Sequence, residues 1–473
     1  MPKYLKISLI ASIISLVLVS AVLLLFLTFR KLKNDLLTYL QKASAGETIT
    51  KDETIHLLKR ISSIDRKIQL FKSLLPQSIS ELSADAHMLA LKILTEHQKY
   101  IVVLQNTNEI RATGGFMGSY FVLESDAGQL QPIEIQDIYT PDGQYTGEIA
   151  APPGVAEYLS EGKGLRLSNA NWWFDLEKSG EQISYFFENT IEQNLDGVIF
   201  INLSLVEKLL DLTGELYLPD YQQLVTSNNF AQLARSDRDQ FFPGSQEKAN
   251  FLNHFLTLLK PKLIEVITKD PQLFLSWLTE QISQKNLQVY SRDQEINALL
   301  TRRHLTTTPI QINDGLNYLL IESNVGINKA NRLVSREVTI DLEENQERFS
   351  ITWKNLNTFA YVNYQRIYLS PASELVEFKV DGQTMDSTTI SQNTFIDSTG
   401  QSWQELAFLV SVLGQNQNTI ELTMRSKLSL EQKKRLALFK QAGLNNTRYR
   451  INHIPTQASR ELELNSDQLI SFD

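Results

Sequence analysis

The longest apolar stretch of the chain lies near its N-terminus. Residues 7–29 contain no charged residue, no proline and no glycine. As a helix this stretch would be about 34 Å long, enough to cross the hydrocarbon core of a membrane. It is longer than the apolar region of a signal peptide, and Arg30 and Lys31 follow it directly. The pattern predicts a transmembrane anchor over residues 1–30, with a cleaved signal peptide as the alternative.

The next pattern has the period of a helix. Residues 47–75 contain no proline or glycine, and Gly46 and Pro76 bracket them. Apolar residues recur there with the alternating spacing of a coiled-coil heptad: Leu57, Ile61, Ile64, Ile68, Phe71 and Leu75. We therefore expect a helical stalk over residues 31–95. The seam fits a homodimer through the stalk, and it equally fits a helix that packs in its own domain or in a helical hairpin.

Short apolar runs then alternate with amphipathic segments. The runs at 101–104, 120–123 and 197–201 are typical of buried strands. The segments at 181–188, 203–210 and 248–267 have apolar residues at helical spacing. Strands interleaved with helices predict an α/β layer domain, which we place at residues 96–305.

The C-terminal part has the period of a strand. Val338, Ile340 and Leu342 alternate with polar residues, and after a polar turn Phe349 and Ile351 do the same. This pattern predicts a β-hairpin, and further strands of the same kind predict a β-sandwich over about residues 310–426. A basic segment, 430–442, is expected to form a terminal helix. We place this β-rich domain at residues 306–473.

Composition excludes several classes of function. The chain has 54 acidic residues against 45 lysines and arginines, a formal net charge of −9, without a long run of one sign. A nucleic-acid footprint would need a clustered basic surface. There is no cysteine, which excludes disulfides and thiolate chemistry. The six histidines show no metal-ligand spacing.

One short motif has the residues of a ligand site. Arg111 follows a predicted strand, and Gly114 and Gly115 come directly after it. A glycine pair permits positive φ and close approach of the backbone to a ligand, and successive N–H groups can bind an anion. An arginine can donate two hydrogen bonds to a phosphate. The alternative is a tight turn with Arg111 on the surface.

The sequence around this motif, "VVLQNTNEIRATGGFMGSYFVL", closely resembles the signature of a bacterial family known as domain of unknown function 4012. Four further stretches resemble that family: "ANWWFD" at 170–175, "LDGVIFINLSLVEKLLDLTGELYL" at 195–218, "SNVGINKANR" at 323–332 and "YVNYQRIYL" at 361–369. The resemblance covers about residues 95–425. The chain departs from it at Ser168, where an acid is expected, and lacks the usual proline after Asp175.

The same family is distantly similar to the LytR-CpsA-Psr phosphotransferases. These are membrane-anchored, extracytoplasmic enzymes that move glycopolymers from a polyprenyl-diphosphate carrier to the cell wall, usually with Mg²⁺. The resemblance implies a single-pass protein of the cell envelope whose main domains are extracytoplasmic. Their Pro-Arg-Asp triplet would fall near residues 140–142, where this chain has no arginine.

The resemblance and the residue chemistry together give a set of candidate site residues. Catalytic phosphate contacts are assigned to Arg111, Arg235 and Arg238, ligand contacts to Gly114, Gly115, Asn171, Trp172 and Trp173, and Mg²⁺ to Asp142 and Asp175. The arginines at 235 and 238 also fit a solvated loop, and the tryptophans also fit a core. The function is then transfer or binding of a polyprenyl-diphosphate-linked glycopolymer. The alternative is a non-catalytic envelope scaffold or binding module on the same fold.

Overall fold

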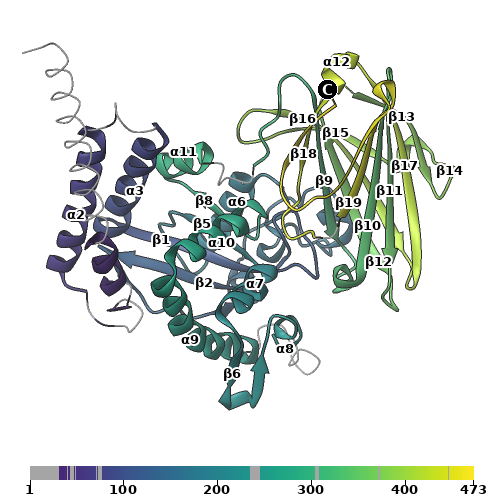
Figure 1. Ribbon diagram of the computed structural model, residues 1–473. Helices are drawn as coiled ribbons and strands as arrows, with labels where there is room; N and C mark the ends of the chain where they lie inside the picture. The colour runs from purple at the N-terminus through teal and green to yellow at the C-terminus, as the bar shows by residue number, and fades with distance from the viewer. Residues whose placement is uncertain are drawn as a thin grey trace, which may run out of the picture. The chain divides into compact units, whose positions relative to one another are not determined.

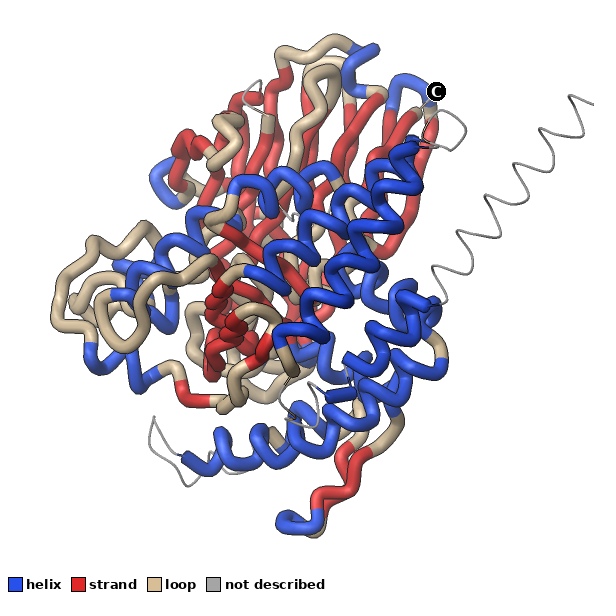
Figure 2. Tube along the Cα trace, turned by 90° about the vertical axis from the view of Figure 1, so that its left-hand side faces the viewer, coloured by secondary structure: helices blue, strands red, loops and turns tan. Residues whose placement is uncertain are grey.

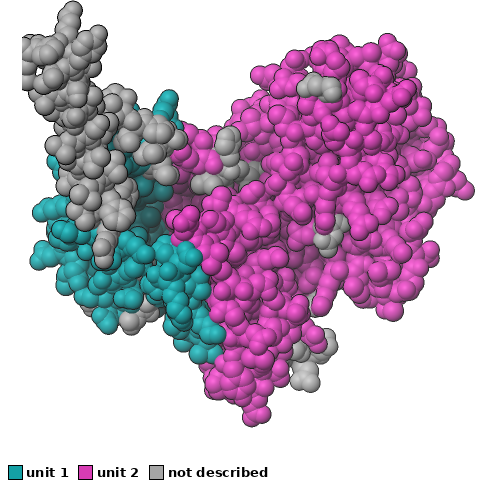
Figure 3. Space-filling model, viewed as in Figure 1, with its two compact units in different colours: residues 1–99, 123–133, 257–271 teal, residues 100–122, 134–256, 272–473 magenta. Residues whose placement is uncertain are grey.

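The computed structural model describes residues 31–39, 41–42, 47, 49–70, 72, 77–234, 246–303, 308–370, 373–445 and 447–472. The chain divides into two compact units, which Figure 3 distinguishes by colour. Unit 1 comprises residues 1–99, 123–133 and 257–271, and unit 2 comprises residues 100–122, 134–256 and 272–473. Every site described below lies within unit 2.

Unit 1 contains a helical hairpin. Its helices are α2 (Lys51–Leu70) and α3 (Gln77–Thr95), which pack against each other. Leu57, Ile64 and Ile68 of the predicted seam are buried in the single chain. The hairpin interpretation of the seam therefore fits the structure, and the homodimer stays a prediction. Phe71 and Leu75 lie outside the described residues.

The expected transmembrane anchor requires a correction. Among the residues that the structure describes, no helix is both long enough and apolar enough to cross a membrane. Helices of sufficient length, such as α2 and α9 (Gln246–Lys269), carry charged side chains along their length. The stretch that suggested the anchor, residues 7–29, lies outside the described residues. The transmembrane helix and the single-pass membrane location are therefore withdrawn.

A mixed sheet lies mainly in the first part of unit 2, and the start of β1 and the end of β2 belong to unit 1. Its strands are β1 (His97–Asn106), β2 (Phe116–Asp126), β4 (Gln136–Asp137), β5 (Gly197–Asn202) and β8 (Leu287–Ser291). The order is β2-β1-β5-β8, β4 pairs with β2, and β3 (Gln129–Leu130) pairs with the end of β2 that belongs to unit 1. β1 and β5 are parallel, whereas β8 is antiparallel to β5. The parallel pair brings the residues that follow β1 and β5 to one edge of the sheet.

Helices connect these strands, and the chain is mixed α/β as predicted. The other helices are α4 (Tyr139–Gln144), α5 (Val155–Tyr158), α6 (Leu176–Glu188), α7 (Leu203–Thr213), α8 (Phe230–Leu233), α10 (Pro271–Ser283) and α11 (Gln294–Arg302), and β6 (Leu216–Leu218) pairs with β7 (Gln223–Val225). Helix α6 has Ile183, Phe186 and Phe187 on one face, and these pack with Val198 and Phe200 of β5. This packing fixes α6 against the sheet.

Two β-sheets share a core in the second part of unit 2 (Figures 1 and 2). One has the order β14-β13-β17-β11-β10-β19-β20 and the other β15-β16-β12-β9-β18-β21. Their strands are β9 (Leu316–Asn324), β10 (Val334–Leu342), β11 (Gln346–Asn355), β12 (Tyr361–Leu369), β13 (Ser373–Val380), β14 (Gln383–Thr384), β15 (Ser391–Ile396), β16 (Ser402–Val412), β17 (Asn416–Ser426), β18 (Arg435–Phe439), β19 (Thr447–His453), β20 (Ala458–Glu463) and β21 (Gln468–Ser471). Alternate residues such as Ile340 and Ile351 enter the common core. The predicted hairpin at 338–353 is present as β10 and β11.

The predicted terminal helix at 430–442 is wrong. Helix α12 covers only Leu430–Lys433, and Arg435–Phe439 forms β18, which pairs in parallel with β9. Leu436 and Leu438 pack into the sandwich core, whereas Ala437 and Phe439 pack into a second cluster on the other face. Because both faces of β18 are buried, its sequence shows no alternation that would distinguish a strand from a helix.

Candidate functional site

The structure places Arg111 in the interior of unit 2. Its side chain is 1% exposed, and burial lowers the pKa of its guanidinium. Nη1 donates to the carbonyl oxygens of Asn324 (2.6 Å) and Ile110 (3.1 Å), and Nη2 donates to the Glu109 carboxylate (3.3 Å). Nη2 also reaches Asn169 Oδ1 at 3.4 Å. These contacts of Nη1 and Nη2 all lie within the protein, whereas the buried Nε has no hydrogen-bond partner among the described residues.

The glycine pair permits close packing of the protein against itself. Gly114 has a φ of 139°, and a Cβ there would overlap the side chain of Asn202. A Cβ on Gly115 would overlap the backbone of Asn106. The expected close approach is real, but the approaching groups are the ends of β5 and β1, at Asn202 and Asn106.

The residues of the "ANWW" stretch also serve the scaffold. Asn171 Nδ2 donates to Thr113 Oγ1 (3.0 Å) and to the Gly115 carbonyl (2.8 Å). Trp172 is buried, and the guanidinium carbon of Arg366 lies 4.4 Å from its ring centroid. Trp173 is partly exposed, and Lys178 Nζ lies 4.9 Å from its ring centroid. The core interpretation of Trp172 therefore fits the structure.

The two predicted Mg²⁺ ligands are bonded within the protein. Asp142 accepts hydrogen bonds from Arg166 Nε (3.2 Å) and the Leu167 N–H (2.8 Å). Asp175 caps the N-terminus of α6 and accepts a hydrogen bond from Ser398 Oγ at 3.0 Å. Within the described ranges, no group of three or more acidic or histidine side chains could hold a metal ion. Arg235 and Arg238 lie outside those ranges.

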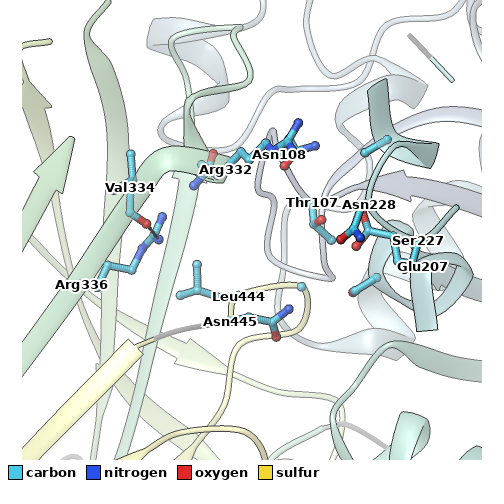
Figure 4. A pocket seen from close by; sticks show the side chains of 14 residues that line it. Thr107, Asn108, Glu207, Ser227, Asn228, Arg332, Val334, Arg336, Leu444 and Asn445 are labelled. Carbon is cyan, nitrogen blue, oxygen red and sulfur yellow. Dashed lines mark hydrogen bonds between the residues drawn. The ribbon is translucent and has the colours of Figure 1, made fainter. Parts of the chain in front are cut away.

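A polar cleft of about 300 Å³ opens beside the motif, at the carboxyl ends of β1 and β5. We call it the β1–β5 cleft. Figure 4 shows side chains from the loop after β1, from α7, and from the segments before β10 and after β18 arranged around it. It is lined by Thr107, Asn108, Ser204, Glu207, Ser227, Asn228, Ala231, Asn331, Arg332, Val334, Arg336, Gly443, Leu444 and Asn445. Amides and hydroxyls predominate, so the cleft is suited to a polar ligand.

Asn108 is the residue that most strongly suggests a ligand. It is only 8% exposed, and its side-chain Nδ2 has no hydrogen-bond partner among the described residues. Its backbone is fixed on both sides, because its N–H donates to Asn106 Oδ1 (3.1 Å) and its carbonyl accepts from the Asn331 N–H (3.2 Å). Buried amide donors are nearly always satisfied in native proteins. A preorganised donor without a partner at the wall of a cleft is therefore a candidate ligand contact.

The cleft also carries two opposite charges. Glu207 of α7 is half-buried, and burial raises the pKa of its carboxyl, whereas the nearby positive charge of Arg332 opposes that rise. In the part of the chain that the structure describes, neither residue forms a salt bridge. Arg336 differs, because Nε and Nη2 donate to the carboxylate of buried Glu322 at 2.6 and 2.7 Å. Glu207 and Arg332 thus remain available to a ligand.

The sequence contained a signal for these residues. Asn108 stands inside the stretch quoted for Arg111, and Asn331 and Arg332 end the stretch "SNVGINKANR". Charge alone favours Arg111 over Asn108 as a phosphate ligand. Arg111 Nη1 bonds to the Asn324 carbonyl, a contact distant in sequence, whereas the buried Asn108 Nδ2 has no partner among the described residues.

Of the two resemblances expected from the sequence, the comparison with protein-family models supports the first, over part of the chain. Residues 95–238 match the family model described as "Protein of unknown function (DUF4012)". The similarity to LytR-CpsA-Psr phosphotransferases is not shown. A search of curated proteins finds no match.

Two solved structures show weak likeness. A proposed nutrient-binding protein from Legionella pneumophila is 8% identical with a TM-score of 0.19, over 26% of this chain and 51% of its own. An aminopeptidase A from the same organism, in complex with aspartic acid, is 10% identical with a TM-score of 0.17, over 28% of this chain and 17% of its own. The chain thus spans about half of the first structure and less of the second, and such TM-scores define no common fold.

Proposed function

We propose that the chain is a non-catalytic binding module whose β1–β5 cleft holds the saccharide part of a polyprenyl-diphosphate-linked glycopolymer. The observation that carries the proposal is the unpartnered Nδ2 of Asn108 at the wall of that cleft. The volume of the cleft is at the lower end of the range of ligand pockets, roughly 300–1,000 Å³, and fits one or two sugar rings.

The chemistry of the lining supports a hydroxyl-rich ligand. A sugar hydroxyl both donates and accepts hydrogen bonds, and so does the amide group of Asn108, Asn228 or Asn445. The Glu207 carboxylate can accept from hydroxyls, and the Arg332 guanidinium can donate to them. Ala231 and Leu444 supply apolar contacts for the C–H faces of a ring.

Binding without transfer is the better supported of the two functions that the sequence suggests. Transfer from a diphosphate needs cationic donors directed at the phosphates. The guanidinium of Arg111 instead donates to three groups of the protein between 2.6 and 3.3 Å. The cleft, by contrast, is lined by Arg332 and by Asn108, whose buried Nδ2 has no hydrogen-bond partner among the described residues.

A glycan array that carries fragments of bacterial polysaccharides tests the proposal. We expect the full-length chain to bind a subset of these glycans, and Asn108→Ala to weaken that binding by roughly 2- to 12-fold, as the loss of one hydrogen bond predicts. Asn393→Ala, an exposed asparagine of β15, is the matched control and should bind as the wild type does. Absence of binding to any glycan, or equal binding by Asn108→Ala, would rule the cleft out.

A further inference from the structure

Three loops meet at one end of the β-sandwich. They connect β9 to β10 (residues 325–333), β11 to β12 (356–360) and β16 to β17 (413–415). The strand register places them together, because Asn324 pairs with Asn363, and Tyr361 pairs with Val412. Hydrogen bonds link the loops directly: the Leu356 N–H donates to the Leu333 carbonyl at 2.9 Å.

These loops expose an unusual number of large apolar side chains. Ile327, Leu333, Leu356, Phe359 and Leu413 are each between 45% and 66% exposed. We call these five residues the apolar tip. Single exposed apolar residues are common on proteins, but a group of them on adjacent loops marks a surface for a partner or a membrane.

Ile327, one residue of the apolar tip, has a strained backbone conformation. Its φ is 52°, in the left-handed region, and its side chain is 66% exposed. A β-branched residue is strained in that region, whereas asparagine or glycine would fit it. The fold therefore holds an unfavourable residue in a position where its side chain makes little contact with the protein. Such strain is typical of functional positions.

The charge of the three loops is one-sided. They contain Lys329 and Arg332 and no acidic residue, and Lys354 precedes the second loop. This is notable in a chain with a formal net charge of −9. Exposed apolar side chains on adjacent loops that carry cations complement a surface with anionic groups outside and an apolar layer beneath.

We propose that the apolar tip docks peripherally on a lipid surface with anionic headgroups. The contact goes beyond glycan binding and stands independently of it. The loop tips enter the interface between headgroups and acyl chains, and the exposed Lys354 faces the headgroup phosphates. Arg332 belongs both to these loops and to the β1–β5 cleft, so a glycan in the cleft would be held close to that surface.

A fluorescent reporter tests the contact at the tip itself. The chain has no cysteine, so Leu413→Cys gives a single attachment point for an environment-sensitive dye in the full-length protein. Leu469→Cys is the matched control, since Leu469 is 62% exposed against 63% for Leu413, and β21 pairs with β18 beside the opposite end of β9. We expect the tip dye to respond to vesicles of equal parts phosphatidylglycerol and phosphatidylcholine. It should respond little to phosphatidylcholine alone, and the control dye to neither.

A second variant separates loss of contact from loss of folding. Ile327→Asn, made in the Leu413→Cys protein, removes an apolar anchor and relieves the strained backbone. We expect the vesicle concentration at half-response to rise by roughly tenfold or more, while the thermal midpoint stays or rises. The proposal is overturned if the tip dye is silent on anionic vesicles, if both dyes respond alike, if neutral vesicles give the same response, or if Ile327→Asn leaves it unchanged.

Discussion

Arg111 bonds through its side chain to Asn324, and Asn324 bonds back to Ile110, the residue before Arg111. Arg111 Nη1 donates to the Asn324 carbonyl at 2.6 Å, and the Asn324 N–H donates to the carbonyl of Ile110 at 3.0 Å. Asn324 ends β9 of the sandwich, and Arg111 follows β1 of the mixed sheet. The residue that resembled a phosphate ligand therefore couples the two sheet systems of unit 2, and this coupling determines what its substitution should do.

Substitution of Arg111 should destabilise the fold. Arg111→Ala would leave the buried Glu109 carboxylate without its cation and the Asn324 carbonyl without a donor. Removing one partner of a buried ion pair costs about 3–5 kcal/mol of unfolding free energy. Denaturant unfolding of the full-length chain measures this loss. Lys163→Ala, at an exposed pair with Glu161, is the control and should cost less than about 1 kcal/mol. Equal stability of both variants would mean that Arg111 is free for another role.

The second glycine of the pair should tolerate no side chain. In Gly115→Ala the new Cβ would overlap the backbone of Asn106, which cannot rotate away as a flexible side chain could. We expect a loss of about 1–3 kcal/mol, typical of overpacking. Gly143→Ala is the control, since no atom lies within 4 Å of its added Cβ and Gly143 stands in α4. The control should be neutral or slightly stabilising. Thermal melts of both variants compare the two positions.

Local patterns predicted the elements better than the site. The alternation in β10 and β11 and the helical face of α6 are visible in the sequence, because one face of each is buried. β18 was misread as a helix, because both of its faces are buried. The length and composition of residues 7–29 predict the N-terminal anchor, but no helix among the described residues supports it.

The role of the glycine motif could not be read from its composition. The glycine pair permits a positive φ, and Gly114 has one, but the group that approaches it is Asn202, which is distant in sequence. Likewise, the partners of Arg111 include Asn324 from another sheet. The residue types of a short motif determine which contacts are sterically possible there. Whether a ligand or the protein itself makes them depends on long-range packing.

The charged form of Glu207, a residue of the β1–β5 cleft, should lower the stability of the folded chain at neutral pH. Its folded-state pKa is raised by burial, so its protonated form is favoured by folding and its charged form is disfavoured. The stabilisation that comes from the protonated form is fully present below the ordinary pKa of 4.5. It is lost as the pH rises through the higher pKa of the folded state. Glu207→Gln should therefore raise the denaturation midpoint at pH 7 and change it little at pH 4. Glu161→Gln, at an exposed position, should show no such pH-dependent gain. A Glu207→Gln midpoint that shifts equally at both pH values would contradict the assignment.

The last prediction concerns a buried amine on the sandwich side of unit 2. Lys440 Nζ donates to the carbonyl oxygens of Gln284 (3.0 Å) and Gln441 (3.1 Å). Burial and the nearby charge of Lys285 together lower the pKa of Lys440 to about 7, against the opposing effect of Asp467. The folded chain then holds fewer protons than the unfolded chain between about pH 7 and the ordinary lysine value of 10.5. Stability should consequently rise with pH across that window, by up to about 1.4 kcal/mol per pH unit from this group.

Lys440→Met keeps the length of the side chain and removes the titration. Its constant offset reports the two lost hydrogen bonds, and its slope reports the amine. Denaturant unfolding at pH 7, 8 and 9 should show the wild type gaining stability relative to Lys440→Met at each step. Parallel pH profiles for the two proteins would show that Lys440 keeps its proton throughout and that the carbonyls and Asp467 outweigh its burial.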